Sequence, residues 1–345
     1  MSEMRANDFV YYYKPDGKGS SGYGKILYHY VPLRYGISDL KNARLKLSRP
    51  TELNDPLDSA GFYKGYPTKE AFFKHFADML FKEQVANLRK QGVPDAEIWR
   101  EYRGAVSEAF SSTLVSFHPL KDNLIASFCA GTDDLNTDVL LWSHYADNCK
   151  GIRIGFQFPD GSPYDICQIA YAKQMPSMDF AKLTRCEVMS NQFNKMLHDY
   201  HGRMICTKHA SWKYEQEYRL ITNVHDNMYV VQDGKMFFVK IPVKYVQTVD
   251  LGCRAFGEEK MKADECFLRL AWKLHVATGL NLDSFRKAEM QIGRYGYKYV
   301  PFKDVIRRFL RRYNNAKYRK AYSLKRPSWV KEWYESHDER GSHNV

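Results

Sequence analysis

The stretch 211–223, SWKYEQEYRLITN, most constrains what this chain can fold into. From Glu217 onward two sets of side chains alternate, and several are aromatic or β-branched, which predicts a β-strand that begins at Glu217. Glu215 lies two residues earlier, and on an extended chain both carboxylates would point to the same face. One of their pKa values would then rise unless Lys213 or Arg219 compensates the charge. The pattern indicates either a strand end with paired, solvated charges or a pair of functional carboxylates.

Other segments follow the period of strands or helices and set the fold class. The predicted strands cover 26–31, 44–48, 124–130, 151–158, 165–172, 217–223, 228–232, 236–241 and 246–251. The predicted helices cover 68–91, 95–110, 138–147, 178–205 and 304–322. Because the helices come in blocks and do not alternate strictly with the strands, we expect an α+β fold.

Composition shifts along the chain suggest three parts. A loop-like lead-in covers 1–25, and the main domain covers 26–256 with an inserted pair of helices at about 67–112. Residues 257–345 are expected to form a mostly helical, basic extension. Glycines at 17, 19 and 22 approximate a phosphate-binding loop, but no Rossmann strand precedes them.

The charge of the chain favours an acidic partner. Lys and Arg total 52 against 40 Asp and Glu, and 303–331 contains 11 basic residues and one acidic residue. This basic region is expected to bind an acidic macromolecule such as nucleic acid, or to pack as an ordinary surface helix. Seven cysteines without a CxxC pair suit a reducing compartment, and we see neither a signal peptide nor a membrane span. We therefore expect a cytoplasmic protein.

Three blocks, in this order, resemble the bacterial domain-of-unknown-function 2971 family over roughly residues 26–255. The first combines LYHY at 27–30 with LNDPLD at 53–58, and the second combines SFC at 127–129 with LWSHYA at 141–146 and KG at 150–151. The third is WKYEQEYR at 212–219. The family name implies no activity.

The same blocks resemble, more weakly, the His-Tyr-Glu signature of ADP-ribosyltransferase-like folds. That resemblance implies a split, mostly antiparallel sheet, NAD as the substrate and a role as a prokaryotic or phage toxin or defence factor. It implies that Glu217 stabilises the ribosyl cation and that Glu215 orients the acceptor. The implied NAD contacts are His29 to the ribose, Tyr145 (or Ser143 or Tyr171) to the nicotinamide, and Arg219 with Lys213 to the pyrophosphate.

Several other readings remain open. A metal-dependent nuclease would use Asp133, Asp134 and Asp138 with Glu215, Glu217 and Lys213. Zinc would be held by His198, His201, Cys206 and His209. A nucleophilic cysteine would be Cys129 with His144 or His209. A non-enzymatic module for nucleic acid or protein would leave the Glu-x-Glu block with a structural role.

Overall fold

A computed structural model describes residues 22–64, 69–109, 120, 122–131, 135–179, 191–226, 228–257, 259–316 and 330. The chain forms two compact units, each assembled from separate stretches of sequence. Unit 1 comprises Met1–Tyr23, Leu45–Cys129 and Pro159–Lys240, and unit 2 comprises Gly24–Arg44, Ala130–Phe158 and Ile241–Val345. The fold is α+β and its strand pairs are mostly antiparallel, which confirms the predicted class.

Unit 1 is built around a three-stranded antiparallel arrangement in the order β4-β10-β6. Its central strand β10 (Glu217–Asn223) begins where the alternation predicts, and it runs between β4 (Asn123–Ala130) and β6 (Ile166–Gln168). The remaining strands form the sheet β11-β12-β2 and the parallel pairs β3-β8 and β7-β9. These strands are β2 (Arg44–Leu47), β3 (Phe62–Lys64), β7 (Ala170–Ala172), β8 (Ser177–Asp179), β9 (Thr207–His209), β11 (Val230–Asp233) and β12 (Met236–Lys240).

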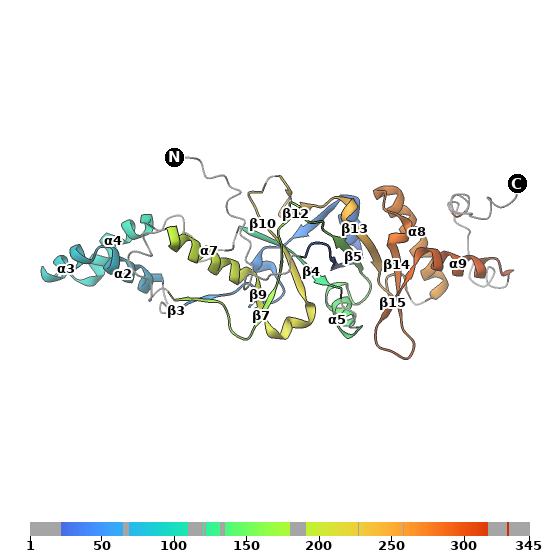
Figure 1. The fold of residues 1–345 in the computed structure, drawn as a ribbon, viewed down its shortest axis with the longest axis horizontal. Coiled ribbons are helices and arrows are strands. Elements are labelled where there is room, and N and C mark those ends of the chain that lie inside the picture. Colours follow the sequence, from blue (N-terminus) through green and yellow to red (C-terminus); the bar gives the residue numbers. More distant parts are fainter. Residues whose placement is uncertain are drawn as a thin grey trace. The chain divides into compact units, whose positions relative to one another are not determined.

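The helices of unit 1 supply its apolar core. They are α2 (Lys69–Leu80), α3 (Lys82–Lys90), α4 (Asp95–Ala109) and α7 (Asn191–Ile205), and α2, α3 and α4 stand together as one group (Figure 1). Buried Phe76, Val106, Ile125 and Tyr200 belong to one cluster, so helices and sheet share a core. The predicted helix 178–205 is wrong at its start, because Ser177–Asp179 pairs with β3 as a strand.

Unit 2 contains the strand order β15-β14-β13-β5-β1. These strands are β1 (Ile26–Val31), β5 (Ile152–Gln157), β13 (Val246–Leu251), β14 (Phe285–Met290) and β15 (Tyr297–Pro301). Only β13 and β14 pair in parallel among them, and helix α8 (Lys260–Thr278) lies between them in the chain. The hairpin of β14 and β15 interrupts the stretch after Gly257 that we predicted to be mostly helical.

Three further helices complete unit 2: α1 (Leu33–Lys41), α5 (Leu135–Tyr145) and α9 (Phe302–Tyr313). Helix α9 buries Phe302, Val305, Ile306, Phe309 and Leu310 and packs on α8 and on the β14-β15 hairpin (Figure 1). The helix predicted over 304–322 is therefore confirmed as far as Tyr313. Residues 258, 317–329 and 331–345 of the predicted basic extension lie outside the described residues. Within the described part of the chain, no helix has the length and apolarity needed to cross a membrane.

Candidate functional site

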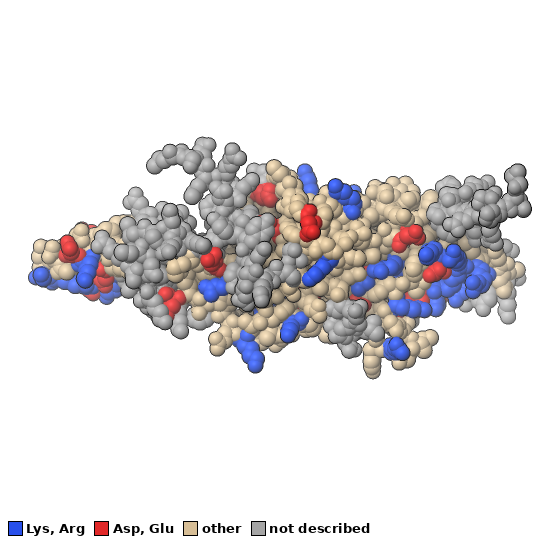
Figure 2. Space-filling model, in the orientation of Figure 1, with Lys and Arg blue, Asp and Glu red and all other residues tan. Residues whose placement is uncertain are grey.

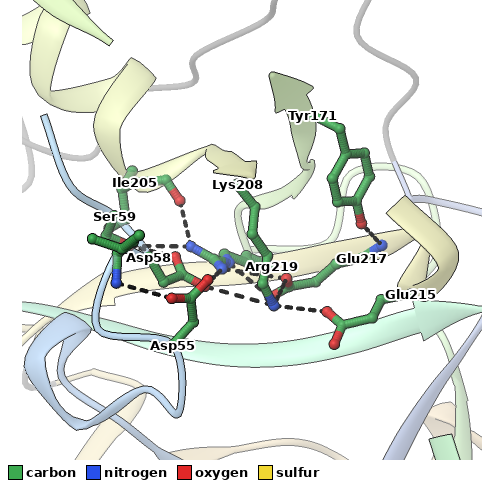
Figure 3. A network of polar contacts seen from close by, with 10 residues as sticks. Asp55, Asp58, Ser59, Tyr171, Ile205, Lys208, Glu215, Glu217 and Arg219 are labelled. Atoms are coloured by element: carbon green, nitrogen blue, oxygen red, sulfur yellow. Dashed lines mark hydrogen bonds and ion pairs between the residues drawn. The ribbon is translucent and has the colours of Figure 1, made fainter. Parts of the chain in front are cut away.

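Five charged side chains meet in the interior of unit 1 (Figure 3). They are Asp58, Lys208, Glu215, Glu217 and Arg219, and none of these side chains is more than 4% exposed. We call this set the buried charge cluster. It holds three carboxylates and two cations, so its formal charge is negative by one when all five groups are ionised.

Arg219 lies at the centre of the buried charge cluster. Its Nε donates to Glu217 Oε1 at 2.7 Å, and its Nη2 donates to Asp58 Oδ2 at 2.6 Å. Its Nη1 donates to the carbonyl oxygen of Ile205 at 2.7 Å and to Ser59 Oγ at 3.2 Å. All three guanidinium nitrogens thus have acceptors, which a fully buried arginine requires.

Lys208 joins the two glutamates that the sequence singled out. Its Nζ lies 2.7 Å from Glu215 Oε2, 3.1 Å from Glu217 Oε2 and 3.7 Å from Asp58 Oδ2. The ring centroid of Trp212 lies 4.7 Å from the same nitrogen, close enough for a cation–π contact. The ammonium group therefore bridges carboxylates that would otherwise repel each other.

A turn, and not a continuous strand, brings the two glutamates together. Glu215 ends a 3₁₀ helix (Ala210–Glu215), and Gln216 adopts the left-handed conformation with φ 45° before β10 begins at Glu217. Residues other than glycine seldom adopt a positive φ, because it is sterically unfavourable for them. Such a conformation persists only where the surrounding structure imposes it. We expected an extended chain to place the carboxylates of Glu215 and Glu217 on one face, and this was wrong because the chain turns at Gln216. The two carboxylates are nevertheless close together, since both accept from Lys208 Nζ.

The surroundings keep Glu217 ionised. Burial alone would raise its pKa, but Arg219 and Lys208 outweigh burial, and together with a hydrogen bond from Ser127 they lower the pKa to about 2. For Lys208, burial acts to lower the pKa, because it disfavours the charged ammonium group. The nearby carboxylates of Glu217 and Glu215 outweigh burial, so the pKa of Lys208 is raised. Arg219 therefore supplies the compensation that the sequence suggested. We predicted that Lys213 could also compensate the charge of the two glutamates. Lys213 is exposed, and Lys208 is the lysine that pairs with them.

Tyr171 fixes the backbone at the start of β10. The Glu217 N–H donates to Tyr171 Oη at 2.8 Å, and burial raises the pKa of this phenol. Tyr171 stands on β7, which pairs with β9 opposite Lys208, so one strand pair positions both side chains. Tyr171 was an alternative for the nicotinamide contact, and Figure 3 shows it next to Glu217.

Asp58 lies in the loop formed by LNDPLD at 53–58. Asp55 Oδ1 accepts from the Leu57 N–H at 2.9 Å, an Asx turn that the Asn-Asp-Pro sequence favours. Ser59 follows with φ 55°, and its hydroxyl group donates to Asp58 Oδ1 at 3.0 Å. Asp58 was not among the predicted site residues, and the structure shows it as a buried partner of Arg219. Lys208 was also missed, because a single lysine in a short strand carries no distinguishing pattern.

The remaining predicted contacts of NAD belong to unit 2. His29 stands on β1 opposite Ile154, Ser143 Oγ donates to the Val139 carbonyl oxygen at 2.9 Å, and Tyr145 is the last residue of α5. Glu215, Glu217 and Arg219 belong to unit 1 and are brought together there. The roles of the three unit 2 residues stay predictions.

Unit 2 has a buried ionic centre of its own, around Arg153. Its Nε donates to Asp250 Oδ2 at 2.7 Å, and its Nη1 donates to Asp138 Oδ1 at 3.0 Å. The rings of Tyr28 and Tyr299 lie 4.2 and 3.8 Å from the guanidinium carbon. Asp138 was predicted as a ligand of a metal-dependent nuclease site. Its ion pair with Arg153 gives this carboxylate a structural role as another explanation.

The other predicted site residues receive little support as metal ligands. Asp133 and Asp134 lie outside the described residues. Among the side chains that the structure describes, no group of three or more His, Cys, Asp or Glu is arranged to hold a metal ion. Cys206, one of the four expected zinc ligands, has its sulfur 3.1 Å from that of Cys167. Cys129, which was predicted as a catalytic nucleophile and not as a metal ligand, is buried on β4 opposite Glu217.

Comparisons with known proteins bear on the family of this chain. No curated protein and no solved structure matches the chain. The model of the family described as "Protein of unknown function (DUF2971)" matches residues 141–220, which include the LWSHYA and WKYEQEYR blocks. The match is shorter than the 26–255 we expected, and it confirms the resemblance to this family over residues 141–220.

Proposed function

We propose that unit 1 carries an NAD-dependent ADP-ribosyltransferase site with Glu217 as its essential carboxylate. The observation that supports this most is the anionic state of Glu217, whose pKa is lowered to about 2 within a cluster of three carboxylates and two cations. A permanently ionised carboxylate suits the stabilisation of positive charge and does not suit proton donation.

The chemistry requires this kind of carboxylate. When the bond between nicotinamide and C1′ of the ribose breaks, its electron pair goes to the ring nitrogen, and nicotinamide leaves as a neutral molecule. Positive charge grows on the ribose, and an acceptor nucleophile then forms the new bond to C1′. A carboxylate fixed on a rigid strand stabilises that charge without needing to reorganise. Glu215 would orient the acceptor.

Substrate access depends on Lys208 in this proposal. Glu217 is only 2% exposed, and the Lys208 ammonium group already bridges it to Glu215. We therefore expect the lysine to move away when the ribose binds, so that the developing cation replaces the ammonium group beside the carboxylates. Tyr171 and Trp212 are two aromatic side chains of unit 1 that contact the cluster.

The test is nicotinamide release from labelled NAD, because release is measured without knowledge of the acceptor. Glu217→Gln should lower the rate by about 10²-fold to 10³-fold, as the loss of a fixed electrostatic partner does in other enzymes. Glu215→Gln should retain release but lose transfer to protein or nucleic acid. Circular dichroism would verify that both variants fold. Equal release by the wild type and Glu217→Gln, or none from the wild type, would overturn the proposal.

We also propose that unit 2 binds a polyanion, because exposed cations line α9. Lys303, Arg307 and Arg311 are exposed and spaced four residues apart, so they share one face of the helix. Arg307 also lies 3.5 Å from Asp304 on the same exposed face, and Arg308 pairs with Asp264 and Glu289 away from it. Figure 2 shows Lys and Arg side chains gathered over α9.

Nucleic acid binding by this face would depend steeply on salt. The double variant Arg307→Glu/Arg311→Glu should reduce the slope of log affinity against log salt for a short duplex by about two, one for each lost phosphate contact. Lys41→Glu, an equal change of charge per site at an exposed position of unit 2, should leave the slope nearly unchanged. The same slope for both variants would exclude α9 as the binding face.

A further inference from the structure

Two cysteines of unit 1 face each other directly beside the buried charge cluster. Cys167 Sγ and Cys206 Sγ lie 3.1 Å apart, and both cysteines are free thiols. A disulfide bond has a sulfur–sulfur distance of about 2.0 Å, so a shift of roughly 1 Å would join them. The hydrogen bond from the Ala170 N–H to the Cys206 carbonyl oxygen, 2.9 Å long, already holds the two backbone segments together.

Both cysteines are adjacent to the groups that hold Arg219. Cys167 lies opposite Arg219 in the register of β6 and β10. Cys206 directly follows Ile205, whose carbonyl oxygen accepts from Arg219 Nη1, and precedes β9 with Lys208. A covalent bond at this position would therefore tie the segment that supplies Ile205 and Lys208 to the strand beside Arg219.

We propose that Cys167 and Cys206 form an oxidative modification site, at which hydrogen peroxide converts the two thiols to a disulfide that fixes the buried charge cluster in the arrangement described above. Cys167 is half-buried and reacts first: its thiolate attacks a peroxide oxygen, and water leaves after protonation. The Cys206 thiolate then attacks the oxidised sulfur of Cys167 and releases a second water. Two thiols and one peroxide thus give one disulfide and two water molecules.

The environment of Cys206 sets the rate of the second step. The hydrogen bond with Cys167 and burial both raise the pKa of Cys206 well above that of an ordinary thiol. A small thiolate fraction at neutral pH slows attack, so we expect disulfide formation to accelerate as pH rises. This modification does not depend on NAD chemistry, so its test is independent of the proposed activity.

The test is peroxide treatment of the full chain, alkylation of the remaining thiols, and a non-reducing peptide map. The expected product joins the peptides that contain Cys167 and Cys206, with a mass lower by two hydrogen atoms, and dithiothreitol reverses it. Cys167→Ser and Cys206→Ser should each abolish the product, and Cys266→Ser, a change at an exposed cysteine, should not. No joined peptide at any peroxide dose that leaves the protein folded would overturn the proposal.

Hydrogen exchange tests whether the bond fixes the cluster. Amide exchange over 205–208 and 217–219 should slow about tenfold in the oxidised protein, because local opening must then carry the bonded strand with it. A disulfide that forms without slowing this exchange would contradict the proposal that the bond fixes the buried charge cluster.

Discussion

Arg219 donates to both carboxylate oxygens of Glu217, two residues before it on β10, with distances of 2.7 and 3.3 Å. Neighbours two apart on a strand point to the same face, so this ion pair depends only on β10 being extended. We expect Arg219→Met to lower the free energy of unfolding by about 3 to 5 kcal/mol, because Glu217 and Asp58 would stay buried and lose their guanidinium partner, which leaves Lys208 as the cation among three carboxylates. Chemical denaturation would measure the loss.

Matched variants separate charge from geometry at this position. Arg219→Lys keeps the charge but cannot reach Glu217, Asp58 and Ile205 at once, so its stability should lie between that of Arg219→Met and the wild type. Lys213→Met removes an exposed cation and should change stability by less than about 0.5 kcal/mol. Equal stability of the wild type and Arg219→Met would contradict the central role of this guanidinium group.

The lowered pKa of Glu217 predicts that unit 1 loses stability in acid. Because the pKa falls from 4.5 to about 2 on folding, the stabilisation is fully present above pH 4.5 and is lost as the pH falls through 2. The magnitude is on the order of 3 kcal/mol. Glu217→Gln has no proton to gain and should remove this part of the acid slope. A slope between pH 5 and 2 that is unchanged in Glu217→Gln would contradict the assignment.

Much of this fold follows from local pattern, whereas the buried charge cluster does not. The alternation after Glu217 correctly predicted the start of β10, and the helical period of 304–322 correctly predicted α9, because each pattern depends on neighbours within a few residues. The β14-β15 hairpin was missed because basic and helix-forming residues mask a short strand pattern.

The partners of Arg219 lie far away in sequence and leave no local signal. Asp58 is 161 residues away and Ile205 contributes only a backbone carbonyl group, which any residue could supply. Lys208 reaches the glutamates because β9 pairs in parallel with β7, a relationship that periodicity cannot reveal. Sequence therefore identified the two glutamates and Arg219, and the tertiary fold identified Lys208 and Asp58.

Asp39 predicts an opposite pH dependence in unit 2. This carboxyl group on α1 is buried, and its Oδ2 atom has no hydrogen-bond partner among the described atoms. Burial raises its pKa to about 7, although Arg44 partly opposes the shift. Protonated Asp39 therefore contributes to the stability of the folded state, and this contribution is fully present below pH 3.8. It is lost as the pH rises through 7, where the buried carboxyl group ionises.

Asp39→Asn should remove this loss. At pH 8 the variant should be more stable than the wild type by on the order of 2 kcal/mol, because the ionised carboxylate no longer has to be buried. Thermal unfolding at pH 4 and pH 8 would measure the difference. A variant that is equally destabilised at both pH values would show that Asp39 has a packing role instead.

Cys149 is a buried thiol of unit 2 whose labelling is expected to begin at lower pH than that of an ordinary thiol. A hydrogen bond from Cys253 is the main cause that lowers the pKa of Cys149 to about 6, burial opposes it, and Tyr297 Oη at 2.8 Å adds to the lowering. Most of this thiol would be ionised at pH 7, and the thiolate is the nucleophile in alkylation. The measurement is the rate of iodoacetamide labelling between pH 5 and 9, followed by peptide mapping.

Variants of the two hydrogen-bond donors test the cause of this reactivity. Cys253→Ala should move the midpoint of Cys149 labelling to higher pH by more than Tyr297→Phe does, because the Cys253 hydrogen bond is the larger cause. Exposed Cys266 serves as the internal reference in each sample. If Cys149 were labelled with the same midpoint as Cys266 in the wild type, the lowered pKa and the role of Cys253 would both be wrong.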